Sequence, residues 1–547
     1  MLFNNKNKDS ILGMHIFTVM FLKKNEMKLI EKWAPFLFVL MILTACKNKE
    51  DQKEPMKNSI VAKYYEEPYR PQFHFTPEQM WMNDPNGMVY HKGVYHLFYQ
   101  YYPDSTVWGP MHWGHAISKD LVHFEHKPIA LYPDELGYIF SGSAVLDKSN
   151  TSGFGTKENP PLVAIYTYHD MEGEKAGRND YQTQGIAYSL DNGESWAKFE
   201  GNPVIGNGGI KDFRDPKVMW HEASKRWVMT LVAGDHAQFY SSKDLKEWQL
   251  TGEFGKDKGA HGGVWECPDL FKLKIEGSAE EKWILLISVN PGAPNGGSGT
   301  QYFIGDFDGK RFTTAQDDIR WVDWGTDNYA GVTYSNAPND ETIFIGWMSN
   351  WAYAQDTPTE TWRSAMTVPR KLSLRKIGER HELINYPIEY LQAIIENGDQ
   401  KKIEVPTNET ETIAFNTFSQ SEIRFKTASR DFDLVFKNSL GENFSLEMDS
   451  EKGVFTLDRA QSGKIDFQED FGGSVQKMPI SNLPNGEVEV RILIDASSVE
   501  VFVNKGQYVM TAQLFPNEDY NELDVANPSN TSLEFADFRV SSVKRIW

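Results

Sequence analysis

Short hydrophobic runs, separated by Gly, Asn and Asp, follow one another through residues 59–390. Examples are residues 161–168, 227–232, 282–289 and 342–347. No long segment in this region keeps the hydrophobic period of an amphipathic helix. Short apolar runs bounded by turn-forming residues are typical of β-strands, so we predict that this part of the chain is all-β.

A weak repeat runs through the predicted strands, in which a strand is followed by a turn and then by an aromatic residue. Its copies are Ser118-Lys119-Asp120-Leu121 leading to Phe124, Ser189-Leu190-Asp191-Asn192-Gly193 leading to Trp196, Ser242-Lys243-Asp244-Leu245 leading to Trp248 and, more loosely, Gly305-Asp306-Phe307-Asp308-Gly309 leading to Phe312. A unit that recurs in an all-β chain indicates the blades of a β-propeller. Independent hairpins in a sandwich are the alternative.

The pattern changes at residues 391–402, where Gln, Glu, Asn and Lys replace the Trp- and Gly-rich sequence, and we interpret this segment as a linker. Alternating strands follow, such as 487–494 and 498–503, with turn signals at Gly472-Gly473 and Asn485-Gly486. Residues 403–547 are therefore predicted to form a separate β-sandwich.

The N-terminal 45 residues are predicted to be a signal region rather than part of the folded protein. From Met27, which we interpret as the true start, Lys28 and Lys32 precede a short apolar run at 33–43. The ending Leu43-Thr44-Ala45-Cys46 resembles a bacterial lipoprotein signal, which implies a lipid anchor at Cys46, a tether at 46–58 and a place in the bacterial cell envelope, on the outer membrane or cell surface. An ordinary secretory signal, with a periplasmic or secreted product, is the alternative.

Composition narrows the choice of ligand. The chain has 76 Asp and Glu against 56 Lys and Arg and a net charge of −20, which argues against nucleic acid as a partner. Its 16 Trp suit stacking on sugar faces as well as they suit an aromatic core. No metal-ligand spacing occurs and Cys267 lacks a second soft ligand, so we expect no cofactor.

Three acidic residues, each with a proline one or two positions later, are candidates for chemistry. They are Asp84, Asp215 and Glu266. A structural role is the alternative for each: a tight turn at Asp84, an ion pair of Arg214 with Asp215, and a solvated turn acid at Glu266.

The motifs around these acids occur in the order and rough spacing seen in the β-fructosidases, the glycoside hydrolase family of invertases, inulinases and levanases. They are Trp81-Met82-Asn83-Asp84-Pro85-Asn86-Gly87, Phe140-Ser141-Gly142-Ser143, Arg214-Asp215-Pro216 and Glu266-Cys267-Pro268, with Ser497-Ser498-Val499-Glu500-Val501-Phe502-Val503 in the predicted sandwich. The resemblance implies a five-bladed β-propeller followed by a C-terminal β-sandwich.

Carried over motif by motif, the resemblance implies that Asp84 is the nucleophile, Glu266 the general acid and base, and Asp215 the transition-state stabiliser of a retaining glycosidase. Such chemistry needs one ionised and one protonated carboxyl. Arg214 is expected to orient Asp215. The implied sugar contacts are Asn83, Gln100, Trp108, Phe140, Ser141, Arg214 and Trp351, with Trp362 as a further candidate and the aromatic loop 108–113 as a stacking platform.

Several activities fit this resemblance. An exported enzyme gains most from polymers that cannot cross a membrane, which favours hydrolysis of the fructans levan or inulin. A sucrose invertase, a fructosyltransferase or a catalytically inactive fructan-binding protein are alternatives, and an arabinan hydrolase ranks below them. The oligomeric state stays open.

Overall fold

Five mainly antiparallel sheets follow one another in the first part of the computed structural model, which describes residues 64–547. Blade I comprises β1 (Met80–His91), β2 (Val94–Tyr102), β3 (His112–Ser118) and β4 (Phe124–Leu131), and blade II comprises β5 (Tyr138–Leu146), β6 (Leu162–His169), β7 (Gln182–Ser189) and β8 (Ala197–Lys198). Blade III comprises β9 (Phe213–His221), β10 (Arg226–Ala233), β11 (Ala237–Ser242) and β12 (Trp248–Phe254). Blade IV comprises β13 (Val264–Lys274), β14 (Glu281–Asn290), β15 (Gly299–Phe307) and β16 (Phe312–Thr313). Blade V comprises β17 (Tyr329–Thr333), β18 (Thr342–Met348), β20 (Ala365–Met366), β21 (Arg370–Ile377) and β22 (Arg380–Pro387).

The first strands of the blades form a closed ring, because β1, β5, β9, β13 and β17 each contact the next and β17 contacts β1. The short strand β19 (Trp362–Arg363), which follows β18 in the sequence, pairs in parallel with β1 and ties the end of the propeller to its beginning. The predicted five-bladed propeller is confirmed.

The sequence repeat marks the turn between the third and fourth strands of blades I to IV. In blade III the Ser242 hydroxyl accepts a hydrogen bond from the Leu245 amide at 2.9 Å, and Asp244 Oδ1 accepts one from the Glu247 amide at 2.9 Å. Leu245 is buried with φ of 65°, so these bonds hold a left-handed backbone that leucine otherwise avoids.

Two six-stranded sheets form the predicted C-terminal β-sandwich. One runs β23 (Lys401–Val405), β34 (Leu533–Ser542), β25 (Ser421–Thr427), β30 (Val488–Asp495), β31 (Ser498–Val503) and β32 (Tyr508–Gln513). The other runs β24 (Thr410–Ala414), β33 (Glu522–Ala526), β26 (Phe432–Lys437), β27 (Asn443–Asp449), β28 (Val454–Gln461) and β29 (Gln476–Pro479). Their inward-facing residues alternate along each strand and enclose one hydrophobic core.

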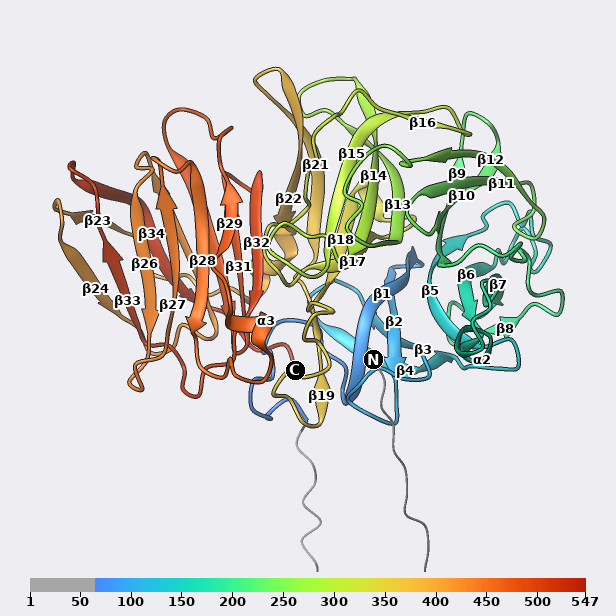
Figure 1. The fold of residues 1–547 in the computed structure, drawn as a ribbon, viewed down its shortest axis with the longest axis horizontal. Coiled ribbons are helices and arrows are strands. Elements are labelled where there is room, and N and C mark those ends of the chain that lie inside the picture. Colours follow the sequence, from blue (N-terminus) through green and yellow to red (C-terminus); the bar gives the residue numbers. More distant parts are fainter. Residues whose placement is uncertain (1–63) are drawn as a thin grey trace, which may run out of the picture. The chain divides into compact units, whose positions relative to one another are not determined.

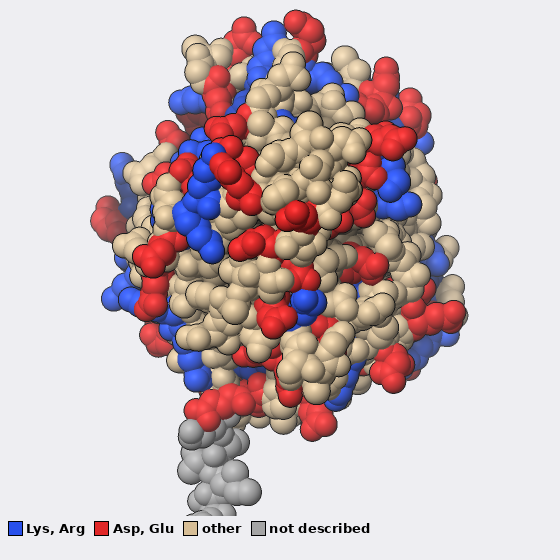
Figure 2. All heavy atoms as spheres, turned by 90° about the vertical axis from the view of Figure 1, so that its left-hand side faces the viewer, with Lys and Arg blue, Asp and Glu red and all other residues tan. Residues whose placement is uncertain are grey.

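Propeller and sandwich belong to one compact unit, and Figure 1 shows the sandwich strands beside β21 and β22 of blade V. The segment 391–402 overlaps the 3₁₀-helix η2 (Glu389–Ile394), whose Leu391 and Ile394 are buried against Phe502 of the sandwich. On the face shown in Figure 2, acidic and basic side chains are interspersed. Within residues 64–547 no helix is long and apolar enough to cross a membrane. The predicted signal region, tether and Cys46 lie outside the described residues.

Candidate active site

A pocket of about 300 Å³ brings together all ten site residues predicted from the sequence. They are Asn83, Asp84, Gln100, Trp108, Phe140, Ser141, Arg214, Asp215, Glu266 and Trp351. Three further residues line it that the sequence did not single out: His169, Glu174 and Gln355. Trp362, the additional candidate, does not line this pocket; it is buried, with the Arg70 guanidinium 4.4 Å from its ring centre.

The five innermost strands each carry a β-bulge at the level of the pocket. Each bulge inserts one extra residue relative to the second strand of the blade, at positions 82–85, 139–142, 214–217, 266–269 and 329–332. A bulge interrupts the ladder and redirects side chains, and it leaves room for a proline that has no N–H to donate. The prolines after the three acids are thus accommodated, and the bulges supply all three carboxyls.

Three of these bulges hold a non-glycine residue in the left-handed backbone region: Asp215 with φ of 65°, Cys267 with φ of 44° and Ala330 with φ of 53°. Non-glycine residues persist there only when their surroundings impose it. The Asp215 amide donates to Thr167 Oγ1 at 2.9 Å, and the Cys267 amide donates to Asp215 Oδ2 at 3.0 Å. The left-handed backbone of β13 at Cys267 is therefore tied to the Asp215 carboxylate of β9, in the preceding blade.

Asp84 is surrounded by hydrogen-bond donors. Asn83 Nδ2 donates to Oδ1 at 3.0 Å, the Ser141 hydroxyl donates to Oδ2 at 2.6 Å, and the Cys267 thiol lies 3.4 Å from Oδ2. The Trp81 indole donates to Asn83 Oδ1 at 2.8 Å and so fixes the amide that faces Asp84. These donors hold the carboxyl group in one orientation, aimed into the pocket.

Glu266 is held from two sides. Arg214 Nη2 donates to its Oε1 at 2.7 Å, and the Tyr329 hydroxyl makes a short hydrogen bond to its Oε2. Arg214 was expected to orient Asp215, but its Nε lies 3.9 Å from Asp215 Oδ2, so its direct bonds go to Glu266 and, at 3.0 Å, to Asp212. Burial raises the pKa of Glu266 even though Arg214 and Tyr329 oppose the shift.

The pKa of Asp215 is strongly perturbed. Burial is the main cause and Arg214 opposes it, while the charges of Glu266 and Asp84 add to it, and together they raise the pKa of Asp215 to about 7. Like charges confined in one dry site cannot all ionise together. The group of three carboxyls therefore retains a proton near neutral pH, as an acid-assisted cleavage needs.

Beyond the carboxyls, the pocket wall is aromatic and amide-bearing. Trp108 packs edge-on against Phe140 with ring centres 6.1 Å apart, and the buried Trp113 indole donates to the Phe140 carbonyl at 3.0 Å. The Gln100 amide donates to Asn86 Oδ1 at 2.6 Å. Within residues 64–547 no group of three or more His, Cys, Asp and Glu side chains is arranged to hold a metal ion.

The chain matches the glycosyl hydrolases family 32 N-terminal domain over residues 74–387 and the family 32 C-terminal domain over residues 390–542. It is 47% identical to a levanase of Bacillus subtilis (strain 168), over 88% of this chain and 72% of that protein. It is 40% identical to an extracellular exo-inulinase of Aspergillus awamori, over 86% of this chain and 93% of that protein. The chain belongs to glycosyl hydrolase family 32.

Solved structures agree with this assignment. The crystal structure of exo-inulinase from Aspergillus awamori has a TM-score of 0.82 at 37% identity, covering 89% of this chain and all of that one. The β-fructofuranosidase of Schwanniomyces occidentalis, solved with fructosyl-erythritol, has a TM-score of 0.78 at 32% identity, covering 88% of this chain and 99% of that one. The resemblance to the β-fructosidases that the motifs indicated is confirmed.

Proposed function

We propose that this chain is a retaining glycoside hydrolase that cleaves β-fructofuranosidic bonds in fructans. The observation that carries the proposal is the convergence of Asp84, Asp215 and Glu266 in one pocket with opposed environments. Asp84 accepts hydrogen bonds from Asn83 and Ser141, whereas burial raises the pKa of Glu266 and favours its protonated form. The levanase and exo-inulinase names of its relatives support the substrate class.

The first step breaks the glycosidic bond. Asp84 attacks the anomeric carbon of the terminal fructosyl unit while Glu266 donates its proton to the leaving oxygen, which gives a fructosyl ester on Asp84 and a shortened chain. Positive charge develops on the sugar ring, and Asp215 stabilises it. Arg214 and Tyr329 keep the Glu266 carboxyl facing the leaving oxygen.

The second step releases fructose. Glu266, now a carboxylate, takes a proton from water, and the resulting nucleophile attacks the anomeric carbon and displaces Asp84. Two displacements retain the anomeric configuration. The test is the anomer of the first product, followed by NMR during hydrolysis of a fructan: initial release of the β-anomer supports the proposal, and initial release of the inverted anomer contradicts it.

Polymeric fructan is the proposed substrate. Sucrose is the alternative substrate, because an invertase of Schizosaccharomyces pombe is 35% identical over 88% of this chain. Initial rates on levan, inulin and sucrose decide between them. A clearly higher kcat/KM on sucrose replaces the polymer assignment with an invertase-like one. Accumulation of longer oligosaccharides in place of free fructose indicates a fructosyltransferase.

The anchor at Cys46 belongs to the same proposal, and it rests on the sequence 43–46, outside the described residues. A lipid anchor holds the enzyme at the cell envelope, where polymers too large to cross a membrane are met. Cys46→Ala is expected to move the protein from the membrane fraction to the soluble fraction, with kcat unchanged. If the amount of protein in the membrane fraction is the same for Cys46→Ala and the wild type, the anchor is contradicted, and the proposed reaction is unaffected.

A further inference from the structure

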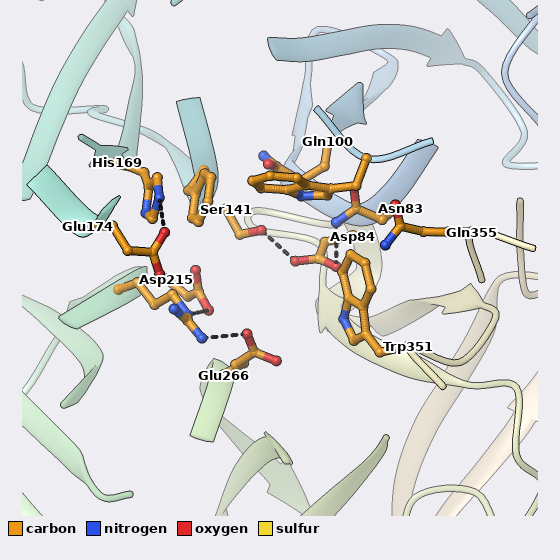
Figure 3. A pocket seen from close by; sticks show the side chains of 13 residues that line it. Asn83, Asp84, Gln100, Ser141, His169, Glu174, Asp215, Glu266, Trp351 and Gln355 are labelled. Atoms are coloured by element: carbon orange, nitrogen blue, oxygen red, sulfur yellow. Dashed lines mark hydrogen bonds and ion pairs between the residues drawn. The ribbon is translucent and has the colours of Figure 1, made fainter. Parts of the chain in front are cut away.

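Glu174 is a charged residue of the pocket that the proposed mechanism does not use. It lies on the short helix α2 (Met171–Lys175), in the connection between β6 and β7. Its side chain is 44% exposed, against 6% for Asp215 and 17% for Glu266, so it lies at the mouth of the pocket rather than at its base. Figure 3 shows Glu174 beside His169, on the side of the pocket away from Trp351 and Gln355.

His169 holds the Glu174 carboxylate in place. The His169 ring stacks on Phe140 with centres 4.1 Å apart and planes 6° from parallel, and Gln182 Nε2 donates to its Nδ1 at 3.2 Å. With Nδ1 accepting, Nε2 carries the proton and donates to Glu174 Oε2 at 3.1 Å. Burial and a nearby guanidinium lower the pKa of His169 to about 4, so the ring is neutral and the contact is a hydrogen bond near neutral pH.

The backbone under Glu174 is fixed as well. The Asp170 side chain accepts from the Gly173 amide at 3.0 Å and the Asp170 carbonyl accepts from the Glu174 amide at 3.0 Å. Arg178 bridges Asp170 at 3.1 Å and Asp180 at 2.8 Å. A rim residue held by its helix cap and by a buried ring is preorganised, which lowers the entropy lost when it binds a ligand.

We propose that Glu174, positioned by His169, binds hydroxyl groups of the saccharide unit on the leaving-group side of the scissile bond, an inference that rests on the proposed function. The three catalytic carboxyls lie deeper in the pocket than Glu174 and would take the terminal fructosyl unit, so the next unit of the chain must emerge at the mouth. His169 engages Oε2 and, among the contacts of the described residues, Oε1 is left to accept a hydrogen bond. A carboxylate oxygen is a strong acceptor for a sugar hydroxyl.

The test compares a substrate that has a second sugar with one that has none. These are a fructan trisaccharide and methyl β-fructofuranoside, assayed with the wild type, Glu174→Ala, Glu174→Gln and Glu172→Ala. The last is a matched control, because Glu172 lies on the same helix and carries the same charge but is 85% exposed and paired with Lys175.

In Glu174→Ala the ratio of kcat/KM for the trisaccharide to that for the methyl fructoside is expected to fall about tenfold, mainly through KM, as loss of one charge-assisted hydrogen bond predicts. Glu174→Gln keeps an acceptor and is expected to recover part of the ratio. His169→Phe preserves the stack on Phe140 but removes the donor, and is expected to lower the ratio by a smaller factor. Glu172→Ala is expected to leave it at the wild-type value.

An unchanged ratio in Glu174→Ala overturns the inference, and so does an equal loss on both substrates, which places Glu174 at the first sugar or in the fold. If the wild type cleaves neither compound, the proposed function fails instead. The inference is then decided by calorimetric titration of the trisaccharide. Affinity lost in Glu174→Ala and kept in Glu172→Ala supports it, and equal affinity in the two variants overturns it.

Discussion

Asp84 and Glu266 have opposite surroundings within one pocket, and their proposed roles depend on that difference. Asp84→Asn removes the nucleophile and Glu266→Gln removes the proton donor, so each is expected to lower kcat by on the order of 10³-fold or more. Both substitutions keep the shape of the side chain, and the thermal unfolding midpoint of each variant checks that the fold is intact. Full activity in either folded variant contradicts the assignment.

Asp215 is expected to weaken the fold at neutral pH while it serves the reaction. Its pKa rises from an ordinary 3.8 to about 7 on folding, so the folded protein binds this proton more tightly than the unfolded chain does. The free energy of unfolding therefore falls as pH rises from about 4 to about 7, by about 1.4 kcal/mol for each unit of the shift.

Asp215→Asn removes that titration. The variant is expected to unfold at a higher temperature than the wild type at pH 7 and to show a flatter dependence of the midpoint on pH, while its turnover falls by orders of magnitude because charge stabilisation is lost. Calorimetry of both proteins from pH 4 to pH 8 tests this. Parallel profiles contradict the buried, shared-proton arrangement.

At the scale of single residues, the sequence predicted the three acids, which belong to short motifs, and missed His169, Glu174 and Gln355, which belong to none. Asp84, Asp215 and Glu266 are recognisable because each lies in a motif that resembles those of the β-fructosidases, one or two positions before a proline. Glu174 carries no comparable signal, since nothing in the charged run 170–175 distinguishes it from the solvated Glu172. Only the tertiary contact with His169 does so.

The sequence also did not indicate the hydrogen bond from Arg214 to Glu266. Adjacency in sequence suggested that Arg214 orients Asp215. Neighbouring residues of a regular strand point to opposite faces, but the bulge at 214–217 lets both side chains line the pocket, with Arg214 Nε 3.9 Å from Asp215 Oδ2. The guanidinium consequently reaches across to the next blade and holds Glu266. A bulge cannot be placed from hydrophobic alternation alone, so this contact could not be predicted.

At the scale of elements, the repeated turn was the most informative local signal, because its Ser and Asp side chains accept hydrogen bonds from backbone amides of the turn.

Ser242→Ala leaves the buried Leu245 amide without its acceptor and is expected to lower the free energy of unfolding by about 1–2 kcal/mol. Ser241→Ala, on the opposite face of β11, is the matched control. Urea unfolding measures both, and kcat/KM on a fructan is expected to stay at the wild-type value. Equal stabilities of the two variants contradict the role of the motif.

The closure of the propeller was not predictable from the same pattern. The runs of residues 161–168 and 227–232 indicated strands, and the repeat indicated blades. The pairing of β19 with β1, by contrast, joins two residues to a strand some 280 positions earlier, at Met80↔Trp362 and Trp81↔Arg363. So short a strand is fixed by what it packs against rather than by its own propensity.

At the scale of the whole described unit, buried charges join the propeller to the sandwich. Arg370 of blade V donates to Glu500 of β31 at 2.7 Å and to Asp323 at 3.0 Å, and all three are buried. The segment 391–402 was interpreted as a linker from its polar composition alone. The interface between propeller and sandwich next to this segment is nevertheless packed, and its buried charges, Arg370, Glu500 and Asp323, are paired with one another. We therefore expect propeller and sandwich to unfold together rather than as independent domains.

His74 completes this network and makes the interface sensitive to alkali. Its Nδ1 lies 2.7 Å from Asp495 Oδ2 and its Nε2 lies 2.9 Å from Glu500 Oε1, with all three side chains buried. Burial disfavours the charged ring, but the hydrogen bonds and charges of the two carboxylates outweigh it and raise the pKa of His74 from an ordinary 6.5 to about 9. The folded protein thus keeps an imidazolium that the unfolded chain loses near pH 6.5.

Because the pKa of His74 is higher in the folded protein than in the unfolded chain, protonation of His74 adds to the free energy of unfolding. This contribution is complete below pH 6.5 and is lost as pH rises through about 9. The thermal midpoint of the wild type is therefore expected to fall between these values, and His74→Gln, although less stable throughout, is expected to flatten that fall. His126→Gln is the control, because burial lowers the pKa of His126 to about 4 and this ring is neutral across the whole window. If the thermal midpoint falls with pH at the same slope in the wild type and in His74→Gln, His74 is not charged at the interface. If the slope is lost in His74→Gln and kept in His126→Gln, the loss of stability at alkaline pH comes from the interface between propeller and sandwich.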